Sequence, residues 1–507
     1  MRIFTFLKKY IAGFILIMMA GFSYAGRVMP TNTDTGRFDA TLYLHNSEQL
    51  QKRLGALIDI KKNANDATVF KIVHIGDSHV QMGYMSDAIK DGLQRAFGDA
   101  GGGYLFPYSL AGSYGPRGLV SQKTGTWQHR HWFKNPNTAT TGLTGYSLQL
   151  LSQSGAFACT LEKGPPENTT GLSVWHAGSS AEGMQVYGWY DSGNTLVRIP
   201  LQIREIKTLY RSMNTAVHQT RCIVNPDMAL RRFSFEWRSD SGTAVKPEFL
   251  GFRPEQAVQR GVEYHSYGLV GAQFSHFLAH SDVSLAQLSA LQPDLVIFSF
   301  GSNEAYNPGW DSSVNASKMK AFFRALQVQL PNAAVMLTTC PDTRSNGRTP
   351  PMQVKVNNLL RSVAQNEQLS LFDLNAAMGG WGSVYRWSRA GLVLKDLLHF
   401  NANGYRLQGK MLIAALLNEY NRIEDQAVQT TDLQQFLDSM QVVIHPVNVV
   451  SPEPDAVAPA ALMHRVKKGE TLYSISRRYG VPVERLKQIN RLSRPYIIRP
   501  GDVIKIR

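Results

Sequence analysis

The chain has 507 residues, of which 43% are hydrophobic and 18% charged, a composition typical of a globular protein with two to four domains. Its three cysteines exclude a disulfide-dense scaffold, and no nucleic-acid-binding motif occurs along it. The net charge of +15 fits either an anionic polymer partner or a basic surface that is merely solvated.

The N-terminus predicts a secretory signal peptide over residues 1–25. Three basic residues precede the apolar run 11–22, and Ser23 and Ala25 supply the small residues at which a signal peptidase cleaves. A retained anchor is the alternative, but the run is shorter than the roughly 20 apolar residues of a full membrane span. No cysteine follows the run, so a lipid anchor is not indicated. We expect an exported, soluble chain without a stable membrane anchor.

A strand that delivers a candidate nucleophile follows. Residues 46–64 have helical spacing, residues 69–76 (VFKIVHIG) form an apolar run typical of a buried parallel strand, and residues 83–97 return to helical spacing. Ser78 therefore stands at a strand-to-helix junction, where α/β sheets hold reacting groups. The alternative is an ordinary helix cap, because Gly-Asp-Ser occurs by chance in about one chain in ten of this size.

Residues 121–261 have a different pattern of hydrophobic residues. Helical periodicity disappears, and short alternating stretches follow one another with Gly, Asn and Asp between them. We predict an inserted all-β sandwich, whose aromatic residues serve the core or offer faces for sugar stacking. Cys159 and Cys222 fall within it and either form a disulfide or remain free thiols.

Helices and strands alternate again from residue 262 to 423. Apolar strands are predicted at 295–300, 334–339 and 369–374, and helices at 272–280, 283–291, 314–330, 353–365 and 404–423. The fold class is therefore α/β: a doubly wound parallel-sheet domain built from residues 46–120 and 262–423, interrupted once.

The C-terminal part reads as a linker and a small α+β module. Residues 424–463 lack periodic pattern and contain several prolines, whereas 464–507 read strand, helix, helix, strand. The module resembles a LysM domain on seven residues at the family's spacing: Gly469, Thr471, Leu472, Ile475, Asn490, Pro500 and Gly501. The resemblance implies binding of glycans that contain N-acetylglucosamine, such as peptidoglycan; a basic module without a ligand is the alternative.

A serine nucleophile needs a base, and the base needs a group that orients it. Among the 13 histidines only His399 has an aspartate three residues earlier, in Asp396-Leu-Leu-His399. At this spacing the carboxylate can reach Nδ1 of His399 and leave Nε2 for Ser78. Taken alone, the same pattern is usually a capping arrangement at the surface.

Donors for an oxyanion are also predicted. The strand at 295–300 ends in Gly-Ser-Asn303, and Gly271 can present its N–H without a side chain, with Gly268 as the second choice. Each could instead be a simple turn.

Four short motifs, around Ser78, Gly271, Asn303 and His399, together resemble the four sequence blocks of the SGNH, or GDSL-type, hydrolase superfamily. The resemblance implies an esterase with Ser78 as nucleophile, His399 as base and Asp396 as its orienter. It also implies an oxyanion hole formed by the N–H groups of Ser78 and Gly271 with the side chain of Asn303, and no metal or cofactor. Glu304 departs from the aspartate of many members.

A narrower likeness comes from the string HIGDSH at 74–79, the β insertion and the string GSNEA at 301–305. These features resemble the branch of the superfamily that contains peptidoglycan O-acetylesterases. In that branch a sandwich resembling a carbohydrate-binding module is inserted in the hydrolase domain. Two roles are open for His79: contact with substrate, or a position that faces solvent, which is the preferred interpretation. Two roles are likewise open for three aromatic residues before Asp396: they either line a glycan groove or pack a loop. These residues are Trp381, Tyr385 and Trp387.

The resemblances imply an exported serine esterase that removes O-acetyl groups from peptidoglycan, in the periplasm, in the cell envelope or secreted. Three alternatives stay open: an esterase for another acetylated polysaccharide such as acetylxylan, an acetyltransferase using the same triad, and a non-catalytic glycan-binding envelope protein.

Overall fold

The computed structural model describes residues 42–423, except 43, 63–66, 134–139, 167, 179–183, 214, 239–247, 258–259 and 346. It also describes 463–466, 470–472, 475, 486, 487, 490 and 501–505. The chain divides into two compact units, Met1–Val447 and Asn448–Arg507. The predicted signal peptide (1–25) and, apart from Met463, the predicted linker (424–463) lie outside the described residues. No described helix has the length and apolar character needed to cross a membrane.

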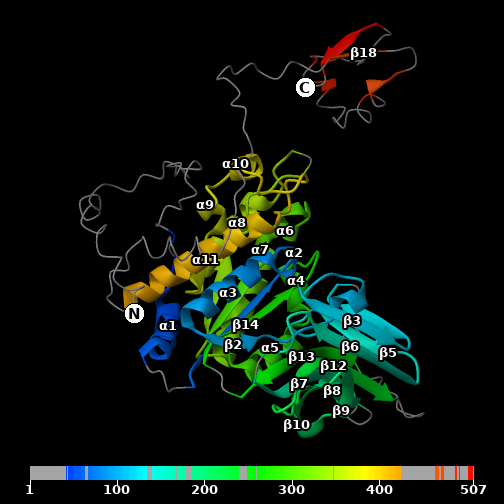
Figure 1. The fold of residues 1–507 in the computed structure, drawn as a ribbon. Coiled ribbons are helices and arrows are strands. Elements are labelled where there is room, and N and C mark those ends of the chain that lie inside the picture. Colours follow the sequence, from blue (N-terminus) through cyan, green and yellow to red (C-terminus); the bar gives the residue numbers. More distant parts are fainter. Residues whose placement is uncertain are drawn as a thin grey trace. The chain divides into compact units, whose positions relative to one another are not determined.

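A six-stranded parallel sheet organises the first unit (Figure 1), in the order β17-β16-β15-β1-β14-β2. Its strands are β1 (Val69–Gly76), β2 (Asp99–Gly102), β14 (Gly261–Gly268), β15 (Leu295–Ser299), β16 (Ala334–Thr338) and β17 (Ser370–Phe372). β1 pairs with β14 on one side and with β15 on the other. The strand order reverses at β1, and ligands of open α/β sheets bind at the carboxyl ends of strands at such a point.

Helices cover both faces of this sheet, which confirms the predicted doubly wound α/β class. On one face α1 (Glu48–Lys62), α3 (Tyr84–Phe97) and α11 (Ala402–Ile423) lie side by side (Figure 1) and pack on alternate strand residues such as Ile72 and Ile297. The opposite face, with residues such as Ile75 and Phe298, is covered by four other helices. These are α4 (Phe274–Leu278), α5 (Ser281–Leu291), α7 (Ser312–Gln329) and α8 (Gln353–Asn366).

Two antiparallel sheets form the insertion. One has the order β10-β11-β7-β13-β5-β4 and the other β3-β6-β12-β8-β9. The strands are β3 (Leu119–Thr124), β4 (Trp127–His131), β5 (Tyr146–Leu150), β6 (Ser154–Leu161), β7 (Thr169–Ala177), β8 (Met184–Ser192), β9 (Thr195–Pro200), β10 (Gln202–Arg211), β11 (Ala216–Ile223), β12 (Leu230–Arg238) and β13 (Glu248–Gln256). Aromatic rings such as Trp175, Phe235 and Trp237 fill the core, and Cys159 and Cys222 are buried free thiols.

Two strands of the parallel sheet were not predicted. One is β2, whose residues Asp99 and Gly102 pair with Val262 and Tyr264 of β14. β14 itself escaped prediction because it carries Glu263 and His265, which are polar yet buried. Those two side chains are hydrogen-bonded to each other, with 2.8 Å between Oε1 of Glu263 and Nε2 of His265. Arg253 forms an ion pair with the same carboxylate.

The second unit contains the antiparallel pair β18 (Met463–Arg465) and β19 (Val503–Lys505). The Asn490 side chain ties β19 in place: its Nδ2 donates to the carbonyl oxygen of Lys505 (2.7 Å) and its Oδ1 accepts from the N–H of Lys505 (2.6 Å). Leu472 and Ile475 are buried. The predicted strands at both ends of the module are therefore present.

Candidate active site

Ser78 is the first residue of the short helix α2 (Ser78–Gln81), directly beyond the end of β1. Asp77 caps this helix, because its carboxylate accepts a hydrogen bond of 2.9 Å from the N–H of His79. Gly76 permits the close approach of β15: a Cβ there would lie 2.6 Å from the carbonyl oxygen of Ser299. As first residue of the helix, Ser78 has an N–H without an acceptor inside α2.

Asp396 and His399 form the predicted pair. Nδ1 of His399 lies 2.8 Å from Oδ2 of Asp396, and Oδ1 accepts from the N–H groups of Leu398 (2.9 Å) and His399 (3.0 Å). Partial burial of Asp396 acts to raise its pKa, but these hydrogen bonds hold the pKa below its usual range. The carboxylate thus occupies Nδ1 and leaves Nε2 as the ring nitrogen available to another partner.

The loop that carries this pair has a strained backbone at one position. Leu397, between Asp396 and His399, has a φ of 55°, a left-handed conformation that costs a non-glycine residue about 1–2 kcal/mol. It persists because Leu397 is held on both sides: its N–H donates to the carbonyl of Leu394 and its own carbonyl accepts from the N–H of Arg344. The contacts around the loop over-determine its shape.

His79 brings the two halves of the site together. Its ring lies 5.6 Å, centroid to centroid, from the ring of His399, and its Nδ1 is 3.0 Å from the hydroxyl of Tyr405 in α11. Among the described residues no hydrogen bond joins Ser78 to His399, although the next residue, His79, packs against His399. Such bonds are often long in free enzymes and shorten when substrate binds.

The preferred interpretation of His79 as a solvent-facing residue is wrong. Its side chain is buried, and this burial lowers its pKa to about 3. The ring that packs against His399 is therefore neutral and does not oppose a positive charge there.

Two of the predicted oxyanion donors, Gly271 and Asn303, lie close to one another. Asn303 is in the first turn of α6 (Ser302–Tyr306), and its Nδ2 donates to the carbonyl of Ala272, next to Gly271 (2.8 Å). Gly271 has a φ of +77° in a partly exposed turn. Gly268, the second choice, ends β14 opposite Gly76 and packs against the backbone of Gln81. The turn at Gly271 is therefore the one open to a ligand.

Two buried carboxyl groups lie behind these residues. Oε1 of Glu304 accepts from the N–H of Phe274 at 2.6 Å and so ties α6 to the start of α4. Burial raises the pKa of Glu304 to about 7, against the effect of this hydrogen bond. Burial likewise raises the pKa of Asp77 to about 7, against the hydrogen bonds from His79 and Ser302. Glu304, noted as a departure from the family pattern, is thus a buried link and not a surface group.

A buried polar chain that sequence reasoning missed runs beneath the nucleophile. Nδ1 of His74 lies 2.7 Å from the hydroxyl of Tyr264 and its Nε2 lies 2.7 Å from Oγ of Ser299, which accepts from Thr338 at 2.9 Å. The chain crosses four adjacent strands, β14, β1, β15 and β16. Burial lowers the pKa of His74 to about 3, so the ring is neutral.

The three aromatic residues before Asp396 differ in exposure. Trp387 is buried and its Nε1 donates to the carbonyl of Met378, so it packs the loop. Trp381 and Tyr385 are each 42% exposed. Only these two are available to a ligand.

Comparison with known families identifies two parts of the chain. Residues 237–407 match the GDSL-like Lipase/Acylhydrolase family, a range that includes Gly271, Asn303, Asp396 and His399 but not Ser78. Residues 464–507 match the LysM domain. The chain thus contains a GDSL-like acylhydrolase domain and a C-terminal LysM domain, as the sequence predicted. No curated protein matches the chain.

Comparison with solved structures gives a match to one described as "Peptidoglycan O-acetylesterase in action, 5 min". The two share 23% identity with a TM-score of 0.58, over 75% of this chain and 99% of that chain. This coverage exceeds what residues 46–120 and 262–423 could fill, so the shared fold extends into the β insertion.

Smaller matches are an α/β hydrolase from the metagenome of Lake Arreo, Spain, and a lipase/acylhydrolase from Enterococcus faecalis. The first has 15% identity and covers 31% of this chain and 72% of its own; the second has 21% identity and covers 32% and 77%. Both have a TM-score of 0.26.

Proposed function

We propose that the protein is an exported serine esterase that removes O-acetyl groups from peptidoglycan. The observation that carries the proposal is the Asp396–His399 pair packed, through His79, beside Ser78 at the strand-order reversal of the sheet. The GDSL-like domain supports esterase activity, and the LysM domain supports a glycan that contains N-acetylglucosamine. The solved O-acetylesterase with the same fold favours peptidoglycan as that glycan.

The chemistry follows from the roles of three side chains. Oγ of Ser78 attacks the acetyl carbonyl while Nε2 of His399 takes the hydroxyl proton, and Asp396 stabilises the imidazolium. The N–H groups of Ser78 and Gly271 and the amide of Asn303 stabilise the oxyanion. His399 then gives the proton to the departing sugar oxygen, which leaves an acetyl-enzyme on Ser78. Water, deprotonated by His399, attacks this ester and releases acetate, and Ser78 regains its proton.

The LysM domain has a separate role in the proposal. Binding the same polymer makes the encounter of the esterase with its ester an intramolecular event and raises the effective substrate concentration. Removing the domain should therefore slow acetate release from insoluble polymer and leave hydrolysis of a small ester unaltered.

The test is acetate release from purified O-acetylated peptidoglycan by the protein, by Ser78→Ala and by a chain ending at Asp425. Release that depends on Ser78, and that falls on insoluble polymer without the LysM domain, would support both parts. If a small aryl acetate were hydrolysed but no acetate came from peptidoglycan, the substrate would have to be another acetylated glycan. Full activity of Ser78→Ala on the aryl acetate would refute the mechanism.

A further inference from the structure

A surface beside His399 carries aromatic and cationic side chains that have no role in the proposed reaction. It is built from α10 (Ser383–Arg389) and residues 342–345 and 347–350. Asp342 holds the two together, because its buried carboxylate accepts from the N–H groups of Gly382 (2.9 Å) and Val384 (3.0 Å) at the start of α10. The hydroxyl of Tyr385 adds a second link by donating to the carbonyl of Gly347 at 3.3 Å.

This surface is continuous with the loop that holds the candidate base. The N–H of Arg344 donates to the carbonyl of Leu397 (2.8 Å), and the N–H of Leu394 donates to the carbonyl of His399 (2.8 Å). The guanidinium of Arg344 lies 5.2 Å from the centre of the Tyr385 ring. A ligand bound on this surface would thus lie next to the reacting ester.

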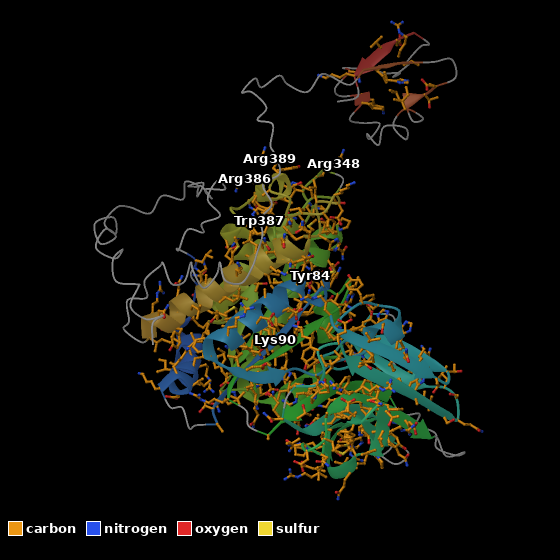
Figure 2. The ribbon with its side chains drawn as sticks, viewed as in Figure 1. Tyr84, Lys90, Arg348, Arg386, Trp387 and Arg389 are labelled. Atoms are coloured by element: carbon orange, nitrogen blue, oxygen red, sulfur yellow. The ribbon has the colours of Figure 1, made fainter. Side chains whose placement is uncertain are left out.

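Exposed aromatic and cationic side chains share this surface. Three exposed side chains follow one another at intervals of four residues: Trp381, just before α10, and Tyr385 and Arg389 within it. Arg348 and Lys395 are exposed as well, and among the described residues neither they nor Arg389 has a carboxylate partner. Figure 2 shows Arg348 and Arg389 at the same end of the unit. We call these five residues the basic rim.

The segments that carry the basic rim have an excess of positive charge. Segments 342–350 and 379–399 together contain five Arg or Lys residues and two aspartates. Of the aspartates, Asp342 is buried and paired with Arg344, and Asp396 is engaged by His399. The cations at the surface are therefore left for a ligand.

We propose that the basic rim binds a stretch of glycan that carries carboxylate groups, next to the acetylated sugar whose ester reaches Ser78. This rests on the proposed function and adds the charge of the substrate to it. Guanidinium groups bind carboxylates with directed hydrogen bonds, and the faces of Tyr385 and Trp381 suit the apolar faces of sugar rings. The rim favours an acidic acetylated glycan over a neutral one of the same backbone.

The experiment compares O-acetylated peptidoglycan with the same polymer after its carboxylates have been converted to neutral amides. For the unsubstituted protein, kcat/KM for acetate release should be about 3- to 10-fold higher on the acidic polymer, which is the size expected for two exposed ion pairs. Because exposed charges are screened, the ratio should approach one as salt rises from about 0.05 M to about 1 M. This comparison requires no variant.

The double variant Arg348→Gln/Arg389→Gln tests the location. Its ratio of kcat/KM on the two polymers should be close to one. The matched control is Lys207→Gln/Arg211→Gln, which removes the same charge from β10, at the opposite end of the unit from α10 (Figure 1). The control should keep the ratio of the unsubstituted protein. Thermal melting of each variant verifies that it is folded.

The outcomes separate the two proposals. Equal rates on both polymers, or a ratio retained in the Arg348→Gln/Arg389→Gln variant, would overturn the role of the rim while leaving the esterase proposal intact. If neither polymer released acetate although an aryl acetate was hydrolysed, the peptidoglycan assignment would fail and the ligand proposed for the rim would fail with it.

Discussion

Glu304→Gln should make the stability of the first unit less dependent on pH. Burial raises the pKa of Glu304 from 4.5 to about 7, so the folded protein binds this proton more tightly than the unfolded chain. The stability due to this proton is fully present below pH 4.5 and is lost as pH rises to about 7. A difference of 2.5 pKa units corresponds to about 3 kcal/mol. Glutamine still accepts from the N–H of Phe274 and carries no charge.

The measurement is the free energy of unfolding in urea at pH 4.5 and pH 8, followed by tryptophan fluorescence. All eight tryptophans belong to the first unit, so the signal does not include the LysM domain. The stability of Glu304→Gln relative to the unsubstituted protein should rise by about 3 kcal/mol between the two pH values. Glu162→Gln, at an exposed carboxylate, is the control. A relative stability that stayed constant with pH would refute the assignment of a buried, proton-binding Glu304.

Four further substitutions test the site. Asp396→Asn should lower kcat on an aryl acetate by about 10²- to 10⁴-fold, because His399 loses the carboxylate that sets its tautomer; a loss below tenfold would contradict this. Asn303→Ala should lower kcat by about 10²- to 10³-fold with little change in KM, and an unchanged kcat would remove Asn303 from the oxyanion hole. Gly268→Ala should cost about 2–3 kcal/mol of unfolding free energy, because its Cβ would lie 2.8 Å from the carbonyl of Asp77. Gly271→Ala should cost about 1 kcal/mol, since its Cβ lies 3.5 Å from Phe133 and only the φ of +77° opposes it; equal losses in a urea titration would contradict the distinction.

Much of the site could be predicted because its parts are local in sequence. The apolar run of β1 specifies a buried strand, and the three-residue spacing of Asp396 and His399 allows their hydrogen bond without knowledge of any other element. The alternation of strands and helices likewise predicts the doubly wound sheet. Local patterns of this kind need no tertiary information.

The parts that escaped prediction depend on residues distant in the chain. His79 is buried because Tyr405 comes to it from α11, and His74 because β14 and β15 supply partners for both of its nitrogens. β14 does not resemble a central strand, since its polar side chains are satisfied only after Arg253 and His265 meet Glu263. Periodicity cannot detect such pairings, because each requires the finished fold.

The position of β1 between β14 and β15 also affects the order in which the chain can fold. Both neighbours follow the whole insertion in sequence, so during synthesis the strand that leads to Ser78 has no partner in the sheet until residues beyond 260 have been made. Pairings between such distant segments form slowly, because a long loop must close first. A chain cut short before β15 would contain the serine but neither Asn303 nor His399. The emergence of esterase activity during refolding would therefore report the closing of the sheet around β1.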